Sequence, residues 1–123
     1  MAHGNFIWNE LMTRDVEKAK AFYTATVGWS FKEMPMPNGS YWIAEMDGKA
    51  VGGMMDMNCA DMEGIPPHWG SYLDVDDVDA RTAAIEAKGG KIIRPPFDIP
   101  DVGRVAVVAD PTGAVICWMT PKM

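Results

Sequence analysis

The chain has 123 residues, of which 48 % are hydrophobic and 23 % charged, a balance typical of a single folded globular domain over residues 1–123. Its formal net charge is -6 and it contains no basic stripe, which argues against nucleic acid or an anionic membrane as a partner. No apolar run approaches the roughly 20 residues of a membrane-spanning helix. The N-terminal residues lack the pattern of a secretory signal, so we expect a cytoplasmic protein.

The first half of the chain predicts a strand, a helix and three more strands. Residues 6–13 form the first strand, and Asp15 is a suitable N-cap for a helix that ends at Gly28. Helical spacing places one set of side chains on a common face of this helix, namely Ala19, Phe22, Tyr23, Thr26 and Val27. Strands are then expected at 31–34, 41–46 and 50–55, with turns at Asn38-Gly39 and Asp47-Gly48.

The second half predicts the same order after a linker at 59–68, which contains paired prolines. A strand at 69–75 precedes a helix that begins after Asp77 and ends at Gly89-Gly90, with Val78, Thr82 and Ile85 on one face. Further strands are expected at 91–94, 104–110 and 114–120. The segment "PPFDIPDVG" is expected to be a proline-broken loop, and residues 110–113 a turn.

The two halves repeat one pattern. Asp15, Val16 and Gly28 each lie 62 residues before Asp77, Val78 and Gly90, an offset of half the chain. We therefore expect an α+β fold of two βαβββ modules, at 5–58 and 68–121.

The repeated module, together with "DVEKAKAFYTATVGW", "LDVDDVDARTAAIEAKGGKI" and "VVADPTGAVICWM", resembles the vicinal oxygen chelate superfamily. This superfamily includes glyoxalase I, bleomycin-resistance proteins and extradiol dioxygenases. "WNELMTRDVEKAKAFY" is similar to a bacterial glyoxalase-like subgroup whose members often carry two such domains. The resemblance implies two modules whose mixed sheets curve into a cup, the glyoxalase/bleomycin-resistance/dihydroxybiphenyl dioxygenase fold, and a homodimer.

The resemblance also implies where a divalent metal would be bound, because ligands come from the first and last strands of each module. Those positions hold Trp8, Gly70, Cys117 and either Gly53 or Met54, of which we take Met54 as the site residue. Tryptophan and glycine cannot coordinate a hard divalent ion, methionine is a soft ligand, and one thiolate makes no site. We therefore expect neither a bound metal nor another cofactor.

Several side chains remain candidates for binding or chemistry. Cys117 is a wall residue of the cup, a reactive thiol or a ligand, and the first alternative is favoured because no cationic neighbour is close in sequence. Glu10 shares a strand face with Trp8, so it is either a general base or one half of a salt bridge. His68, two residues before Gly70, is either a displaced ligand or an ordinary hydrogen-bonded histidine.

Tyr72 continues the face of Gly70, and aromatic rings beside missing side chains suit a flat or apolar ligand. Arg94 and Arg104 flank the proline-rich segment and either grip an anion or are solvated. The leading hypothesis is a metal-free small-molecule binding protein with an aromatic pocket lined by Trp8, Met54, Gly70, Tyr72 and Cys117. The alternatives are a lyase, isomerase or dioxygenase that uses Glu10, and an interaction protein whose interior is filled by its own side chains.

Overall fold

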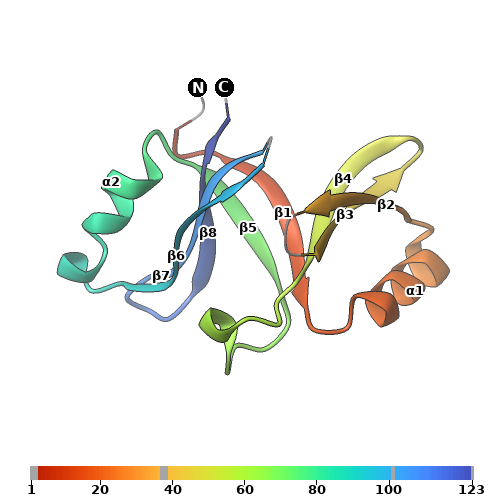
Figure 1. The fold of residues 1–123 in the computed structure, drawn as a ribbon, viewed down its shortest axis with the longest axis horizontal. Coiled ribbons are helices and arrows are strands. Elements are labelled where there is room, and N and C mark those ends of the chain that lie inside the picture. The colour runs from red at the N-terminus through yellow and green to blue at the C-terminus, as the bar shows by residue number, and fades with distance from the viewer. Residues whose placement is uncertain (1–2, 37–38, 101, 123) are drawn as a thin grey trace. The chain divides into compact units, whose positions relative to one another are not determined.

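The computed structural model describes residues 3–36, 39–100 and 102–122, so the predicted turn at Asn38 lies outside the described residues. The chain forms two compact units. Residues Asn9–Trp69 make the first unit, and Met1–Trp8 with Gly70–Met123 make the second. The order of elements along the chain is βαβββ twice (Figure 1), which confirms the predicted α+β class and the repeated module.

The first unit contains one long helix and four strands, except that residues 6–8 of the first strand belong to the second unit. In chain order these are β1 (Phe6–Thr13), α1 (Val16–Val27), β2 (Ser30–Met36), β3 (Gly39–Met46) and β4 (Lys49–Asp56). The strands lie in the order β2-β3-β4-β1, with β1 parallel to β4 and the other pairs antiparallel. Asp47 and Gly48 both have positive φ, 53° and 77°, so a two-residue turn joins β3 to β4 as predicted.

Helix α1 begins and ends where the sequence predicts. The Asp15 side chain accepts a hydrogen bond from the Lys18 backbone N–H at 3.0 Å, and Gly28 closes the helix with φ 83°. The predicted face is right only in part, because Ala19 and Tyr23 are half-buried whereas Phe22 is 58 % and Val27 50 % exposed.

The stripe that is partly buried consists of Val16, Ala19, Lys20 and Tyr23. Two contacts explain this rotation of α1. The Lys20 ammonium lies 3.4 Å from the centroid of the Trp42 ring on β3, and the Trp69 indole N–H donates to the Tyr23 hydroxyl at 3.1 Å. Neither contact is visible in a pattern of apolar residues alone.

The second unit contains the strands β5 to β8, except that the first two residues of β5, His68 and Trp69, belong to the first unit. These are β5 (His68–Asp74), β6 (Lys91–Ile99), β7 (Gly103–Ala109) and β8 (Val115–Pro121), arranged in the order β5-β8-β7-β6 with β5 parallel to β8. Helix α2 (Val78–Ala83) is shorter than predicted. The chain tightens after Ala83 into i→i+3 hydrogen bonds and a 3₁₀ turn at Glu86–Lys88 before Gly89 ends it.

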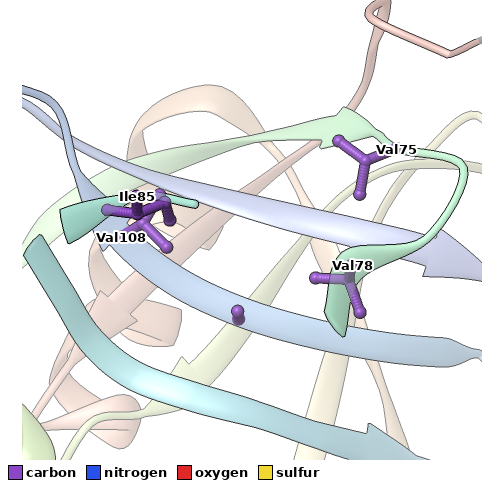
Figure 2. Close-up of a cluster of buried hydrophobic side chains, with 5 residues drawn as sticks. Val75, Val78, Ile85 and Val108 are labelled. Atoms are coloured by element: carbon purple, nitrogen blue, oxygen red, sulfur yellow. The ribbon is translucent and has the colours of Figure 1, made fainter. Parts of the chain in front are cut away.

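The core of the second unit lies between α2 and β7. Figure 2 shows Val75, Val78, Ile85 and Val108 gathered at this point, where Val78 is 1 % and Val108 2 % exposed. The predicted inward face of the helix is thereby confirmed, since Thr82 is also buried. Burial of this apolar surface fixes α2 against one side of the sheet.

Two segments differ from the prediction. Residues 95–99, expected to be part of a loop, continue β6. The prolines are tolerated because β6 is the outermost strand of its unit, and its pairing with β7 shifts between Ile92 and Arg94 and again before Phe97. The linker contains a short 3₁₀ helix, η1 (Ala60–Met62). None of the helices in the described ranges is both long enough and apolar enough to cross a membrane.

Candidate functional site

The pairing register separates the two faces of the sheet in the first unit. Met54 on β4 pairs with Trp42 on β3 and with Leu11 on β1, so these three side chains lie on the same face of the sheet. This is the face on which α1 lies, since Lys20 of α1 contacts the Trp42 ring. Alternation along the strands then places Glu10 and its partner Gly53 on the opposite face.

Met54 therefore does not share the face of Glu10. Its side chain is 1 % exposed and belongs to the layer between the sheet and α1. The sequence predicts either Gly53 or Met54 at the site and favours Met54. The pairing of β1 with β4 instead places Gly53 on the face of Glu10. The cause is turn length, because two residues separate β3 from β4 whereas five separate β7 from β8.

The second unit has the same division of faces. Ala106 and Val108 face α2, and Ala106 pairs with Trp118 of β8. Cys117, one residue away, therefore points to the face opposite α2, together with its partner Tyr72 on the parallel strand β5. Gly70 precedes Tyr72 by two residues and lies on that same face.

The two units match position by position. Glu10 pairs with Gly53 across parallel strands as Tyr72 pairs with Cys117, and Glu10 lies 62 residues before Tyr72. We call the two surfaces that lie away from the helices the open faces. Trp8, two residues before Glu10 on β1, is half-buried.

The central side chains of the open faces are nearly inaccessible. Glu10 is 1 %, Tyr72 2 % and Cys117 0 % exposed, and each of them makes polar or electrostatic contacts. A buried carboxyl group is uncommon because burial disfavours its charged form unless partners compensate. The two cysteines differ, since Cys59 is half-buried whereas Cys117 is fully covered, and both are free thiols.

The residues at the four strand positions do not fit the divalent metal that the sequence resemblance implies. Trp8, Gly53, Gly70 and Cys117 offer a single donor atom, the Cys117 sulfur, whereas a stable site needs three or more. Within the described ranges, no group of three or more histidine, cysteine, aspartate or glutamate side chains is arranged to hold a metal ion. We therefore derive no step through a metal.

His68 is the first residue of β5, one residue before the predicted start of this strand. Its Nδ1 donates a hydrogen bond to the Pro66 carbonyl oxygen at 2.8 Å, because a carbonyl can only accept. Nε2 is buried and has no hydrogen-bond partner among the described residues. His68 is thus hydrogen-bonded, the second of the two predicted alternatives. Among the described residues, no metal-binding group of side chains supports a role as a metal ligand.

The two candidate arginines, Arg94 on β6 and Arg104 on β7, have protein partners. Arg104 forms ion pairs with Asp79 at 2.6 Å and with Asp98 at 3.3 Å, and the guanidinium lowers the pKa of Asp79. Arg94 lies 3.7 Å from the centroid of the Phe97 ring. Neither arginine therefore requires an external anion.

A cluster of aromatic rings escaped the sequence analysis. Tyr23 stacks on Trp29 at 5.2 Å and meets Trp69 edge-on at 5.7 Å, and Trp29 also contacts Phe31. All four residues belong to the first unit. The cluster forms on the α1 side of the sheet, because the Trp69 ring lies 4.0 Å from where a Cβ of Gly52 would stand. Ring contacts between distant segments leave no periodic signal.

Comparison with known proteins identifies relatives. The family model described as "Glyoxalase/Bleomycin resistance protein/Dioxygenase superfamily" matches residues 5–118. The Mycobacterium tuberculosis protein CFP32, which carries the provisional name glyoxylase, is 41 % identical over 111 residues, covering 89 % of this chain and 42 % of that protein. The anthracycline biosynthesis protein DnrV of Streptomyces peucetius is 34 % identical over 125 residues, covering 92 % and 46 %.

The chain thus spans less than half the length of these two relatives. Among solved structures, the methylmalonyl-CoA epimerase of Streptomyces coelicolor in complex with 2-nitronate-propionyl-CoA has a TM-score of 0.64 at 17 % identity, with both chains fully covered. The methylmalonyl-CoA epimerase of M. tuberculosis has a TM-score of 0.62 at 15 % identity, covering 98 % of this chain and 89 % of that one. At such identities the likeness concerns the fold alone.

Proposed function

Since the chain belongs to the glyoxalase/bleomycin resistance protein/dioxygenase superfamily, we propose that it binds a flat aromatic small molecule without a metal. The observation that carries this proposal is the set of residues at the register-matched strand positions. Where metal-binding side chains would stand, the chain has the Cys117 thiol, two glycines and a tryptophan, namely Gly53, Gly70 and Trp8.

The proposed binding surface is the open face of the second unit. Trp8, Tyr72 and Cys117 supply aromatic and apolar surface, and Gly70, on the same face as Tyr72, has no side chain. Because Tyr72 and Cys117 are buried, a ligand can reach them only after this face opens. We therefore expect association to be slower than diffusion allows.

One relative supports the class of ligand. DnrV is named for anthracycline biosynthesis, and an anthracycline has the flat fused rings that stack on tryptophan and tyrosine. We use daunorubicin as the probe, with its binding followed by calorimetry on metal-analysed protein. We expect saturable binding by protein that contains no stoichiometric nickel, zinc, manganese or iron. One equivalent of such a metal, held by protein side chains, would overturn the proposal.

A matched pair of variants locates the site. Gly70→Val adds a side chain to the open face of β5. Ser71→Val instead enlarges a side chain on the opposite face of the same strand. We expect Gly70→Val to weaken daunorubicin binding about tenfold or more, and Ser71→Val to leave it within about twofold, with both variants folded by circular dichroism. Equal affinities for the two variants would argue that the ligand does not contact this face.

The second candidate function is catalysis, which the buried Glu10 carboxyl favours. A carboxylate in a water-poor site can remove a proton from a carbon next to a carbonyl group, as glyoxalase chemistry requires. The provisional glyoxylase name of CFP32 points to the hemithioacetal of methylglyoxal and glutathione as the substrate to test. We expect Glu10→Gln to abolish turnover while substrate binding persists; turnover by this variant would remove Glu10 from the mechanism.

We also propose that the chain forms a homodimer. On α1, Phe22 is 58 % and Val27 50 % exposed. Covering such apolar side chains in an interface is energetically favourable. Light scattering on the purified chain tests this, and a monomer at high concentration would refute it. The cytoplasmic location predicted from the N-terminal residues stays a prediction.

A further inference from the structure

A pocket at the linker of the first unit lies apart from the residues discussed so far. Its volume is about 790 Å³, and it is a shallow depression open to solvent, since most of its lining residues are exposed. Arg14, between β1 and α1, and Asn58, after β4, line it on one side, and the remaining wall consists of the linker residues Cys59, Ala60, Glu63, Gly64, Ile65 and Pro66. Every lining residue belongs to the first unit.

One hydrogen bond positions the Arg14 guanidinium at this pocket, and a second one holds the Arg14 backbone. Its Nη2 donates a hydrogen bond to the Met62 carbonyl oxygen at 2.8 Å, and the Asn58 amide donates to the Arg14 carbonyl oxygen at 3.2 Å. Met62 is 2 % exposed, so the carbonyl that holds the guanidinium belongs to a buried part of the linker. A guanidinium has five N–H donors, so most of them remain for another acceptor.

Arg14 differs from the other arginines of this acidic chain in its partner. Arg81 pairs with Asp76, Arg104 pairs with two aspartates, and Arg94 lies over Phe97. For Arg14, as for Arg94, no ion pair exists within the part of the chain that the structure describes; the Arg14 guanidinium donates to the Met62 carbonyl oxygen, and Glu63 lines the same pocket. A positioned cation in a concave site is thus left without an anion.

We propose that this pocket binds a small organic molecule through a single carboxylate on Arg14. The planar guanidinium matches a carboxylate with two parallel hydrogen bonds, and Ala60, Ile65 and Pro66 offer apolar surface for the rest of the molecule. Glu63 repels a second negative charge, which disfavours phosphate and polycarboxylates. The proposal is independent of the ligand suggested for the second unit.

The test uses benzoate, its neutral analogue benzamide and inorganic phosphate, each titrated into ¹⁵N-labelled protein. We expect benzoate to shift the amide signals of residues 58–65 in a saturable way. Benzamide and phosphate should each bind at least about tenfold more weakly than benzoate. Shifts with phosphate but not with benzoate would overturn the carboxylate assignment. Shifts confined to the second unit would overturn the site.

Two substitutions separate binding from folding. Arg14→Gln should weaken benzoate about tenfold or more, whereas the control Arg94→Gln, in the other unit, should leave it unchanged. Glu63→Gln should strengthen benzoate binding about two- to fivefold, because it removes a like charge from the pocket. An unfolded variant cannot bind more tightly, so unchanged or weaker binding by Glu63→Gln would refute the charge argument.

Discussion

Replacing Met54 by alanine tests the assignment of the sheet faces in the first unit. If Met54 lies between the sheet and α1, as its pairing with Leu11 and Trp42 indicates, it is a core residue and not a ligand contact. Its side chain is 1 % exposed, so almost all of the removed surface is buried in the folded state. The substitution should therefore lower the free energy of unfolding and leave daunorubicin affinity unchanged.

The magnitude follows from the atoms removed. Methionine loses three heavy atoms beyond Cβ, and at about 0.8 kcal/mol for each buried methylene-sized group this is about 2.4 kcal/mol. A cavity that the neighbours fill only partly brings the expected loss to about 3 kcal/mol, within the range for methionine to alanine. The control is Met46→Ala in the same unit, because Met46 is 39 % exposed and should cost less than about 0.5 kcal/mol.

The assay is urea unfolding followed by circular dichroism and tryptophan fluorescence, at constant m-value. A loss below about 1 kcal/mol for Met54→Ala would place the side chain outside the core. If this small loss were accompanied by weakened daunorubicin binding, Met54 would lie on the open face. The pairing register of β1 with β4 would then differ from that described above.

Three further predictions concern other parts of the chain. An aqueous thiol reagent should modify Cys59 but not the fully buried Cys117 in native protein, and both in urea; rapid native labelling of two thiols would contradict the burial. Gly90→Ala should destabilise the protein by about 1–3 kcal/mol in urea unfolding, because the new methyl group would stand 2.8 Å from a carbonyl oxygen of β7; unchanged stability would refute this. Arg81 lowers the pKa of Asp76 from 3.8 to about 2, so the stability that this carboxylate contributes is present above pH 4 and is lost as the pH falls toward 2. Acid titrations should show a weaker decline in this window for Asp76→Asn, and an unchanged slope would argue against the ion pair.

Much of the fold could be predicted from local signals. Asp15 and Gly28 mark α1 because side-chain capping and a left-handed glycine act within a few residues of the helix end. The 62-residue offset likewise predicts the doubled module, which the order of elements confirms. The second half of β6, residues 95–99, was missed because proline counts against a strand unless the strand is known to lie at an edge.

The candidate site was predictable only in part. Trp8, Gly70 and Cys117 follow from counting along the chain, because Trp8 and Gly70 each lie seven residues before a helix-capping aspartate and Cys117 lies seven residues after Asp110. Gly53 does not, because its alignment with Glu10 depends on how β4 pairs with β1 across a turn of different length.

The sequence by itself determined the class of fold, the repeat, the helix ends and the loss of metal-binding side chains, because these depend on residue type and on spacing along one segment. Only the tertiary structure decided which face each strand residue occupies, how α1 is rotated, and that Arg14 meets the linker at a pocket. Those features arise from contacts between residues far apart in the chain, such as Arg14 with Met62, and pairing of that kind has no local signal.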